Sequence, residues 1–332
     1  MFTPQAGLTL PPLNGAHARE RAIVATLLYY DLFAFPLRAD EVVRFAHAPA
    51  ALTVQELPRS GEWWESREGY WFLRGREQFI ARRTELQHAS ASKLERAKKY
   101  AQLLQIIPGV RSIGVTGSLA MESAVPEDDI DFLIITAKNR LWLTRALVLS
   151  ALMAWGVKRP DDGRTEYPNL ICANIFLSEN DLYIPDENLF IAHEICQMLP
   201  LLGESTYRNF LDANRWVKKF LPQWKSASVE FQDRAVWRNT QRAFDLAFAN
   251  AIGMRVEQEL ARRQLKRIES KHARGHNTNV KITPTQLRFH ARDLSDYVVN
   301  TFNARWDALN THLQGRNILR QRTSPENALP QQ

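Results

Sequence analysis

Cysteine is scarce in this chain of 332 residues, which contains only Cys172 and Cys196. Neither residue belongs to a Cys-x-x-Cys pair or to a cluster with histidine. The sequence therefore predicts neither a disulfide framework nor a structural zinc site. Such cysteine usage is typical of a reducing compartment, and we expect a cytoplasmic protein.

Long hydrophobic runs are also missing. The most apolar stretch, residues 141–155, contains Arg145 and is shorter than the roughly 20 residues that a membrane span needs. The first fifteen residues lack the basic start and apolar run of a signal peptide. We therefore expect no membrane partner.

Apolar residues are nevertheless abundant enough for well-packed cores. Hydrophobic residues make up 45% of the chain, with nine Trp and sixteen Phe, and the length allows two or three domains. The formal net charge of +7 is compatible with an anionic partner, and equally with a basic surface that has no specific partner.

The N-terminal quarter of the chain has the pattern of a winged helix. Four helix breakers in residues 1–16 predict a flexible arm. The winged-helix-like domain then covers 17–90, with a helix from Arg19, a second helix over 38–46, and an aromatic hairpin whose strands flank residues 65–69.

The middle of the chain alternates between strands and helices. After a helix over 74–104, strands are predicted at 110–116, 129–136 and 170–177, with a helix from Asn139 to about Trp155. This core spans 91–185. Beyond Pro185 only helices are predicted: a C-terminal helical domain at 186–314, whose last helix starts at Pro284, followed by a tail at 315–332. The predicted class is α+β with a mixed β-sheet core.

Two acids open the strand predicted at 129–136. Alternate residues of a strand point to the same side, so the carboxylates of Asp129 and Asp131 should project together. Unpaired, they would cost several kcal/mol by order of magnitude. A hard divalent cation between them is the simplest compensation.

A Gly-Ser turn precedes the acid pair by about ten residues. Gly117 lets a phosphate approach the backbone, and the hydroxyl of Ser118 can hold a phosphate oxygen. Together with a metal site, such a turn is suited to phosphoryl or nucleotidyl transfer.

At these residues the chain resembles the polymerase beta-type nucleotidyltransferase superfamily. The match is carried by residues 116–120 (TGSLA) and 128–134 (DDIDFLI), within a similar region of about 105–180. A weaker resemblance, at residues 31–37 (DLFAFPL), is to bacterial nucleotidyltransferase-domain proteins of unassigned substrate.

The resemblance implies a nucleotidyltransferase-type sheet and a two-metal enzyme. Asp129 and Asp131 would bind Mg²⁺ or Mn²⁺, while Thr116, Gly117 and Ser118 would hold the phosphates of a nucleoside triphosphate. An acceptor hydroxyl would attack the α-phosphate and release pyrophosphate. The acceptor is unidentified and could be a small molecule, an RNA or a protein.

The family's third acid has no direct counterpart in this sequence. The corresponding strand offers Asn174, which can bind a metal through its carbonyl but cannot act as a base. Asp128, Glu179 or Asp181 could substitute for the missing acid. Otherwise the protein would be a catalytically weak nucleotide-binding sensor with a nucleic-acid- or protein-binding winged-helix module.

Further basic residues are candidate contacts for anions. Arg145, Lys158 and Arg159 could face nucleotide phosphates, or could be ordinary surface charges. A basic stripe between Arg262 and Arg274 could follow a nucleic-acid backbone, although such a run is more often a solvated helix face. The pair His193-Glu194 does not predict a zinc-protease helix, because position 197 is glutamine.

Overall fold

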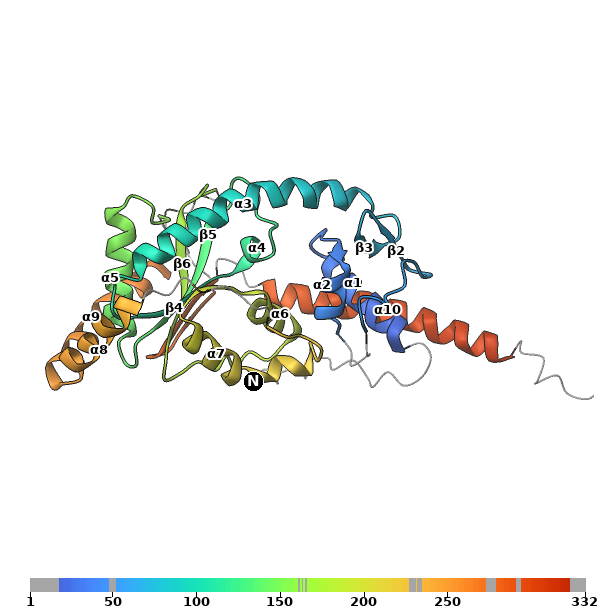
Figure 1. The fold of residues 1–332 in the computed structure, drawn as a ribbon. Helices are drawn as coiled ribbons and strands as arrows, with labels where there is room; N and C mark the ends of the chain where they lie inside the picture. The colour runs from blue at the N-terminus through green and yellow to red at the C-terminus, as the bar shows by residue number, and fades with distance from the viewer. Residues whose placement is uncertain are drawn as a thin grey trace, which may run out of the picture.

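The computed structural model describes residues 18–47, 52–160, 162, 164, 166–226, 231, 235–272, 279–290 and 294–322. The predicted arm at 1–16 lies outside this range, as do residues 323–332 of the predicted tail. Helices are combined with two sheets, so the predicted α+β class is confirmed (Figure 1).

The N-terminal part contains a small antiparallel sheet of strand order β1-β3-β2. The aromatic hairpin is present as predicted, with a turn at Glu68 and Gly69, both of which have positive φ. Helix α1 is buried on all sides from Ala22 to Tyr30. The elements are α1 (Ala18–Asp31), β1 (Leu37–Arg38), α2 (Ala39–Arg44), β2 (Trp64–Arg67) and β3 (Tyr70–Leu73).

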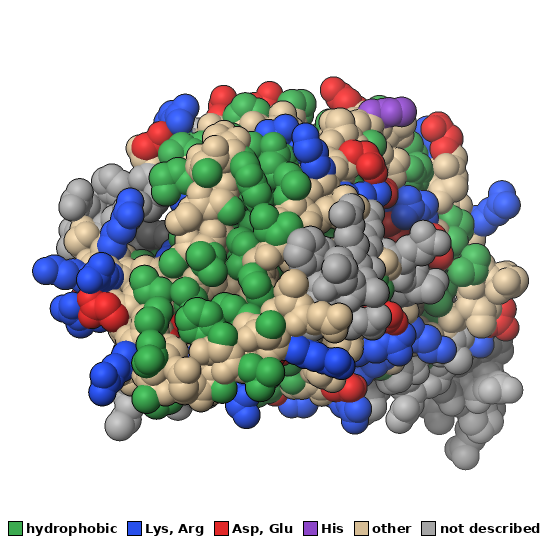
Figure 2. All heavy atoms as spheres, turned by 60° about the vertical axis from the view of Figure 1, so that its left-hand side comes forward, with side chains coloured by type: hydrophobic (Ala, Val, Ile, Leu, Met, Phe, Trp, Pro, Cys, Tyr) green, Lys and Arg blue, Asp and Glu red, His purple; other side chains and the backbone are tan. Residues whose placement is uncertain are grey.

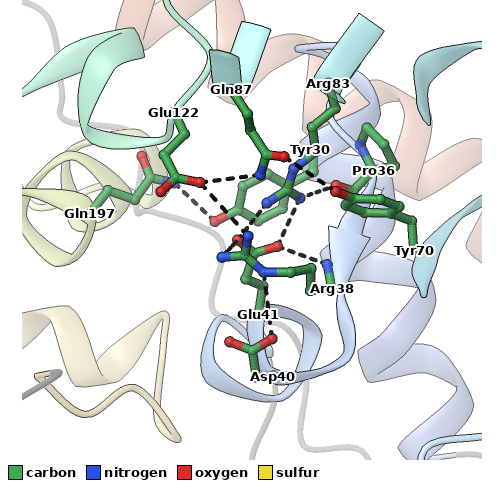
Figure 3. Close-up of polar contacts among 10 residues, drawn as sticks. All are labelled: Tyr30, Pro36, Arg38, Asp40, Glu41, Tyr70, Arg83, Gln87, Glu122 and Gln197. Atoms are coloured by element: carbon green, nitrogen blue, oxygen red, sulfur yellow. Dashed lines mark hydrogen bonds and ion pairs between the residues drawn. The ribbon is translucent and has the colours of Figure 1, made fainter. Parts of the chain in front are cut away.

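A long helix, α3 (Gln78–Leu104), runs from the small sheet to the large one (Figure 1). It is anchored near its start by Arg83, which is 1% exposed and forms an ion pair with Glu41 of α2 at 2.7 Å (Figure 3). The Arg83 guanidinium also lies over the ring of Phe35 at 4.0 Å and that of Tyr70 at 5.0 Å. This polar cluster fixes α3 against the N-terminal part.

The large sheet has the strand order β7-β4-β5-β6-β9-β8. Strand β5 pairs antiparallel with β4 and parallel with β6, and helix α5 (Leu141–Ala154) connects β5 to β6. The strands are β4 (Val110–Val115), β5 (Ile130–Thr136), β6 (Ile171–Ser178), β7 (Leu199–Leu202), β8 (Asn279–Ile282) and β9 (Gln286–His290). The three strands predicted in the core are all present.

The prediction of helices alone after Pro185 is wrong. Strands β7, β8 and β9 come from this part of the chain and extend the large sheet on both sides, so the predicted boundary at 185 divides one sheet. Pro284 lies between β8 and β9 and does not start a helix. The helical elements are α6 (Leu189–Gln197), α7 (Glu204–Ala213), η1 (Arg215–Lys219), α8 (Ala235–Phe248), α9 (Ala251–His272) and α10 (Leu294–Arg322).

The last helix also departs from the prediction, because α10 continues to Arg322, well into the predicted tail. It packs against α1 and α6, and it buries Phe302 and Trp306 in the same apolar core as α1 (Figure 1). Segments near the two ends of the described chain therefore share one core.

Hydrophobic side chains also gather on the surface, on the side where α5, α8 and α9 lie (Figure 2). The most exposed apolar residues of these helices are Met153, Leu246, Ile252 and Met254. Contiguous exposed apolar surface is a common feature of contact sites.

Two buried histidines join the N-terminal part to α6. The Nε2 atoms of His47 and His193 lie 2.9 Å apart, and the ring of Tyr29 stacks on His193 with 3.9 Å between centroids. The Nδ1 atom of His193 lies 3.2 Å from the hydroxyl oxygen of Tyr30. Burial lowers the pKa of His47 to about 3, and burial together with His47 lowers the pKa of His193 well below 6.5.

These histidines predict a loss of stability in mild acid. Both are neutral in the folded state, whereas in the unfolded chain they titrate near 6.5. Their contribution is therefore fully present above about pH 6.5 and is lost as the pH falls, by up to about 1.4 kcal/mol per pH unit for each histidine. Urea unfolding between about pH 7.5 and 5.5 measures this slope. An equal slope in a His47→Asn/His193→Gln variant would contradict the assignment.

Candidate functional site

The two acids converge as the alternation along the strand predicts. Asp129 directly precedes β5 and Asp131 is its second residue. One carboxylate oxygen of each lies within 4.8 Å of the other and of the Cys172 Sγ. Cys172 joins the group because the parallel register places it opposite Asp131 on β6. Its spacing in the sequence gave no sign of this position.

The Gly-Ser bend lies directly against one of these carboxylates. The Thr116 backbone N–H donates to the Asp131 backbone carbonyl at 3.1 Å. Gly117 has φ +67°, and a Cβ at this position would lie 3.2 Å from Asp131 Oδ2. Both the backbone conformation and the close approach therefore favour glycine at this position.

Ser118 is held by a neighbouring acid. Its hydroxyl donates to Asp128 Oδ2 at 2.9 Å, and the Val125 N–H donates to the same oxygen at 3.1 Å. The helix that starts here, α4 (Gly117–Ala120), is a single turn. Asp128 thus holds the loop between the Gly-Ser bend and β5. Because its carboxylate is used for these loop contacts, Asp128 does not take the place of the missing third acid.

A cation already lies beside the acid pair. The Arg159 Nη1 is 2.9 Å from Asp129 Oδ2 and donates to Cys172 Sγ at 3.4 Å. Its guanidinium also lies 4.5 Å from the centre of the Tyr167 ring. Arg159, for which the sequence left open a phosphate contact or an ordinary surface charge, therefore compensates the charge of one acid.

Asn174 contacts the other acid. Its Nδ2 donates to Asp131 Oδ1 at 2.8 Å, from a position where the pairing of β5 with β6 shifts register. Its side-chain carbonyl oxygen, Oδ1, is buried and has no hydrogen-bond partner among the described residues. An unpaired buried acceptor beside two carboxylates is an available metal ligand.

Burial raises the pKa of Asp131 to about 8, and the charge of Asp129 adds to the increase. In the absence of a metal, this carboxyl is therefore largely protonated near pH 7, and a cation would compete with that proton. The oxygen atoms of Asp129, Asp131 and Asn174 fit a hard divalent ion such as Mg²⁺ or Mn²⁺. Burial also raises the pKa of the Cys172 thiol, which favours its neutral form.

The site opens into a cavity of about 410 Å³. The bend, Asp131 and Asn174 form one wall of this cavity. Other lining residues come from α1 and the turn that follows it, α6, the hairpin β8–β9 and α10, and include Tyr29, Tyr30, Phe33, Phe190, Glu194, Lys281, Arg288 and Asp296. A cleft of this size with one polar end is suited to a small-molecule ligand.

Other predicted site residues lie away from the cavity. Arg145 donates to Gln264 Oε1 at 2.6 Å and packs over the rings of Phe176 and Phe289. Burial lowers its pKa to about 10, and Arg267 adds to the shift. Arg145 is thus a contact between α5, β9 and α9, and it is not among the residues that line the cavity.

Neither remaining substitute for the third acid reaches the cavity. Glu179 forms an ion pair with Arg111 at 3.3 Å, and Asp181 accepts a hydrogen bond from Thr285 at 2.5 Å. Within the predicted basic stripe, Arg262 and Arg263 both pair with Glu259 of the same helix. Arg274, at the end of the predicted stripe, lies outside the described residues.

The sequence analysis missed Glu194, a carboxylate of α6 that lines the cavity together with Asp131. Glu194 has no hydrogen-bond or ion-pair partner among the described residues. Burial raises its pKa to about 7, and its charge contributes to the raised pKa of Asp131. An acidic residue in the mostly apolar segment 189–196 was the available signal.

No protein-family model, curated protein or solved structure matches the chain. Among the helices that the structure describes, none combines the length and the apolar character needed to cross a bilayer.

Proposed function

We propose that the protein is a metal-dependent nucleotidyltransferase, which moves a nucleoside monophosphate from a triphosphate to an acceptor hydroxyl. One observation carries the proposal: the carboxylates of Asp129 and Asp131 converge, and Asp131 lies against the Gly117 bend at the wall of a cavity large enough for a small ligand. A hard cation and a phosphate chain need this combination of oxygen ligands and open backbone.

In this proposal the oxygen atoms of Asp129, Asp131 and the Asn174 side-chain carbonyl would hold Mg²⁺, which would supply positive charge to neutralise the phosphates. Gly117 leaves room for a phosphate beside Asp131, because a side chain there would fill the gap. Arg159 orients Asp129 through their 2.9 Å ion pair. The acceptor oxygen bonds to the α-phosphorus, the bond from that phosphorus to the bridging oxygen breaks, and pyrophosphate leaves.

Glu194 is the group best placed to take the proton from the acceptor hydroxyl. It faces the cavity, and its pKa of about 7 suits a general base near neutral pH. We expect Glu194→Gln to lower kcat by about 10²–10⁴-fold, and we expect the wild-type rate to rise with pH up to about 7. Binding of the metal and triphosphate should change little. A wild-type kcat and pH profile in the variant would rule out this role.

Transfer itself is tested with labelled triphosphates, Mg²⁺ or Mn²⁺ and a cell extract as the source of acceptor. Label transferred by the wild-type protein, and not by an Asp129→Ala/Asp131→Ala variant, is the expected result. Equal transfer by both proteins would refute the assignment of these acids.

A nucleotide sensor with weak catalysis is the second candidate. It is favoured by the Arg159–Asp129 ion pair, which compensates one acid without a metal, and by the absence of a third acid from the described strands of the sheet beside the pair. Tight triphosphate binding without transfer, in the presence of extracts rich in small molecules, RNA and proteins, would support the sensor.

A further inference from the structure

Two basic side chains that the acid site does not use line the same cavity. Lys281 and Arg288 lie directly opposite each other on the strands β8 and β9. Both contact Asp186: the Lys281 Nζ donates to Oδ1 and the Arg288 Nη1 donates to Oδ2, each at 2.5 Å. The two oxygens of a single carboxylate thus bridge the two cations.

The bridge leaves an excess of positive charge and an unused donor. Arg288 is 6% exposed, and its buried Nε has no hydrogen-bond partner among the described residues. Burial alone would raise the pKa of Asp186, but the hydrogen bonds from Lys281 and Arg288 outweigh it and lower that pKa. A buried guanidinium beside a lysine is a suitable receptor for a second oxyanion.

Lys281 and Arg288 lie on the same sheet as the acid site, a short distance across the strands. Arg288 lies opposite Ile175 of β6, the residue after Asn174, and β6 lies beside β5, which carries Asp131. Neighbouring strands are spaced by about 4.8 Å, and β9 is two strands away from β5. Arg288 on β9 therefore lies roughly 10 Å from the strand that carries Asp131. Gly117 lies on the other side of Asp131, at the end of β4.

We propose that Lys281 and Arg288 form a subsite for an oxyanion, a phosphate or a carboxylate, carried by the acceptor. Asp186 occupies this subsite through its two oxygens when the acceptor is absent. The assignment to the acceptor rests on the proposed function, because the triphosphate would then lie on the Gly117 side of Asp131. Binding of an oxyanion by the basic pair requires neither a metal nor a triphosphate.

Isothermal titration with inorganic phosphate, and separately with acetate, tests the subsite without divalent ions or nucleotides. We expect Asp186→Asn to bind the preferred anion at least about tenfold more tightly than wild type. In the Asp186→Asn background, Arg288→Gln and Lys281→Gln should each weaken binding by about tenfold or more. The stronger of the two anions identifies the acceptor group as a phosphate or a carboxylate.

Two control variants separate this subsite from the acid site. Asp131→Asn and Ser118→Ala, in the same background, should leave anion binding unchanged. Binding lost through Ser118→Ala but retained in Arg288→Gln and Lys281→Gln would place the anion at the Gly-Ser bend and overturn the proposal. Absence of binding in a folded Asp186→Asn variant would also overturn it. A failure of nucleotidyl transfer with intact anion binding would refute the proposed function alone.

Discussion

Replacing Asp131 by asparagine is expected to abolish nucleotidyl transfer and to stabilise the metal-free protein. Transfer should fall by about 10³-fold or more, since losing a metal ligand removes several kcal/mol of transition-state stabilisation. The stability change has the opposite sign. The folded-state pKa of about 8 lies above the ordinary value of 3.8, so the fold favours the protonated carboxyl. The contribution of this group to stability is therefore fully present below about pH 4. That contribution is lost as the pH rises towards 8.

At pH 7 the asparagine variant should therefore exceed the metal-free wild type by on the order of 1–3 kcal/mol in the free energy of unfolding. Urea unfolding in the presence of a chelator, beside a transfer assay with Mg²⁺, measures both effects. Ser118→Ala provides a control for the stability measurement, because it removes a hydrogen bond to Asp128 without changing the charge of the pair. A variant that is less stable and still active would refute both the metal role and the raised pKa.

Replacing Arg83 by methionine is expected to be the most destabilising single change in the N-terminal part. The substitution leaves Glu41, which is 7% exposed, without its buried partner (Figure 3). Breaking such a pair from one side costs about 3–5 kcal/mol. The variant also loses the stacking of the guanidinium on Phe35 and Tyr70, and the anchor of α3.

The matched control removes both charges. In Arg83→Met/Glu41→Gln the amide can still accept the hydrogen bond that the Arg38 backbone N–H donates to Glu41, at 2.7 Å in the wild type. We expect this double variant to recover a substantial part of the lost stability, measured by urea unfolding. If Arg83→Met alone lies within about 0.5 kcal/mol of wild type, the pair does not anchor α3.

The acid pair and the bend could be predicted because both depend on local sequence. The alternation along the strand places Asp129 and Asp131 on one side, and the turn at Gly117 follows β4, which pairs with β5. The aromatic hairpin at 64–73 has a similarly local signature, aromatic residues on both sides of a glycine turn.

The strands after Pro185 escaped prediction because their signals are short or ambiguous. Strand β7 has four residues, one of them a proline, and its place is set by pairing with β4, which lies some ninety residues earlier in the chain. In the hairpin β8–β9, Pro284 looked like the first residue of a helix, a position that proline also favours. Pairing with β6 decides between these possibilities, and a single sequence does not reveal it.

Asn174 was a candidate from the sequence, but the pairing of Arg159 with Asp129 and the cavity residues from α6 and the hairpin β8–β9 were missed for the same reason. Arg159 reaches Asp129 from a loop thirty residues away, and Glu194 enters the cavity from α6. Lys281 and Arg288 line the cavity only because their hairpin extends the sheet. Spacing along the chain can identify a pair within one strand, but not residues that a sheet of mixed direction brings together.

The most direct test of the account is titration of a non-hydrolysable nucleoside triphosphate analogue into the wild-type protein and into Asp131→Asn, each with and without Mn²⁺. The account predicts that the wild-type protein binds the analogue tightly only with Mn²⁺, and that Asp131→Asn, though folded, loses this metal-dependent binding. Binding of equal strength in both proteins, with no dependence on the metal, would contradict it.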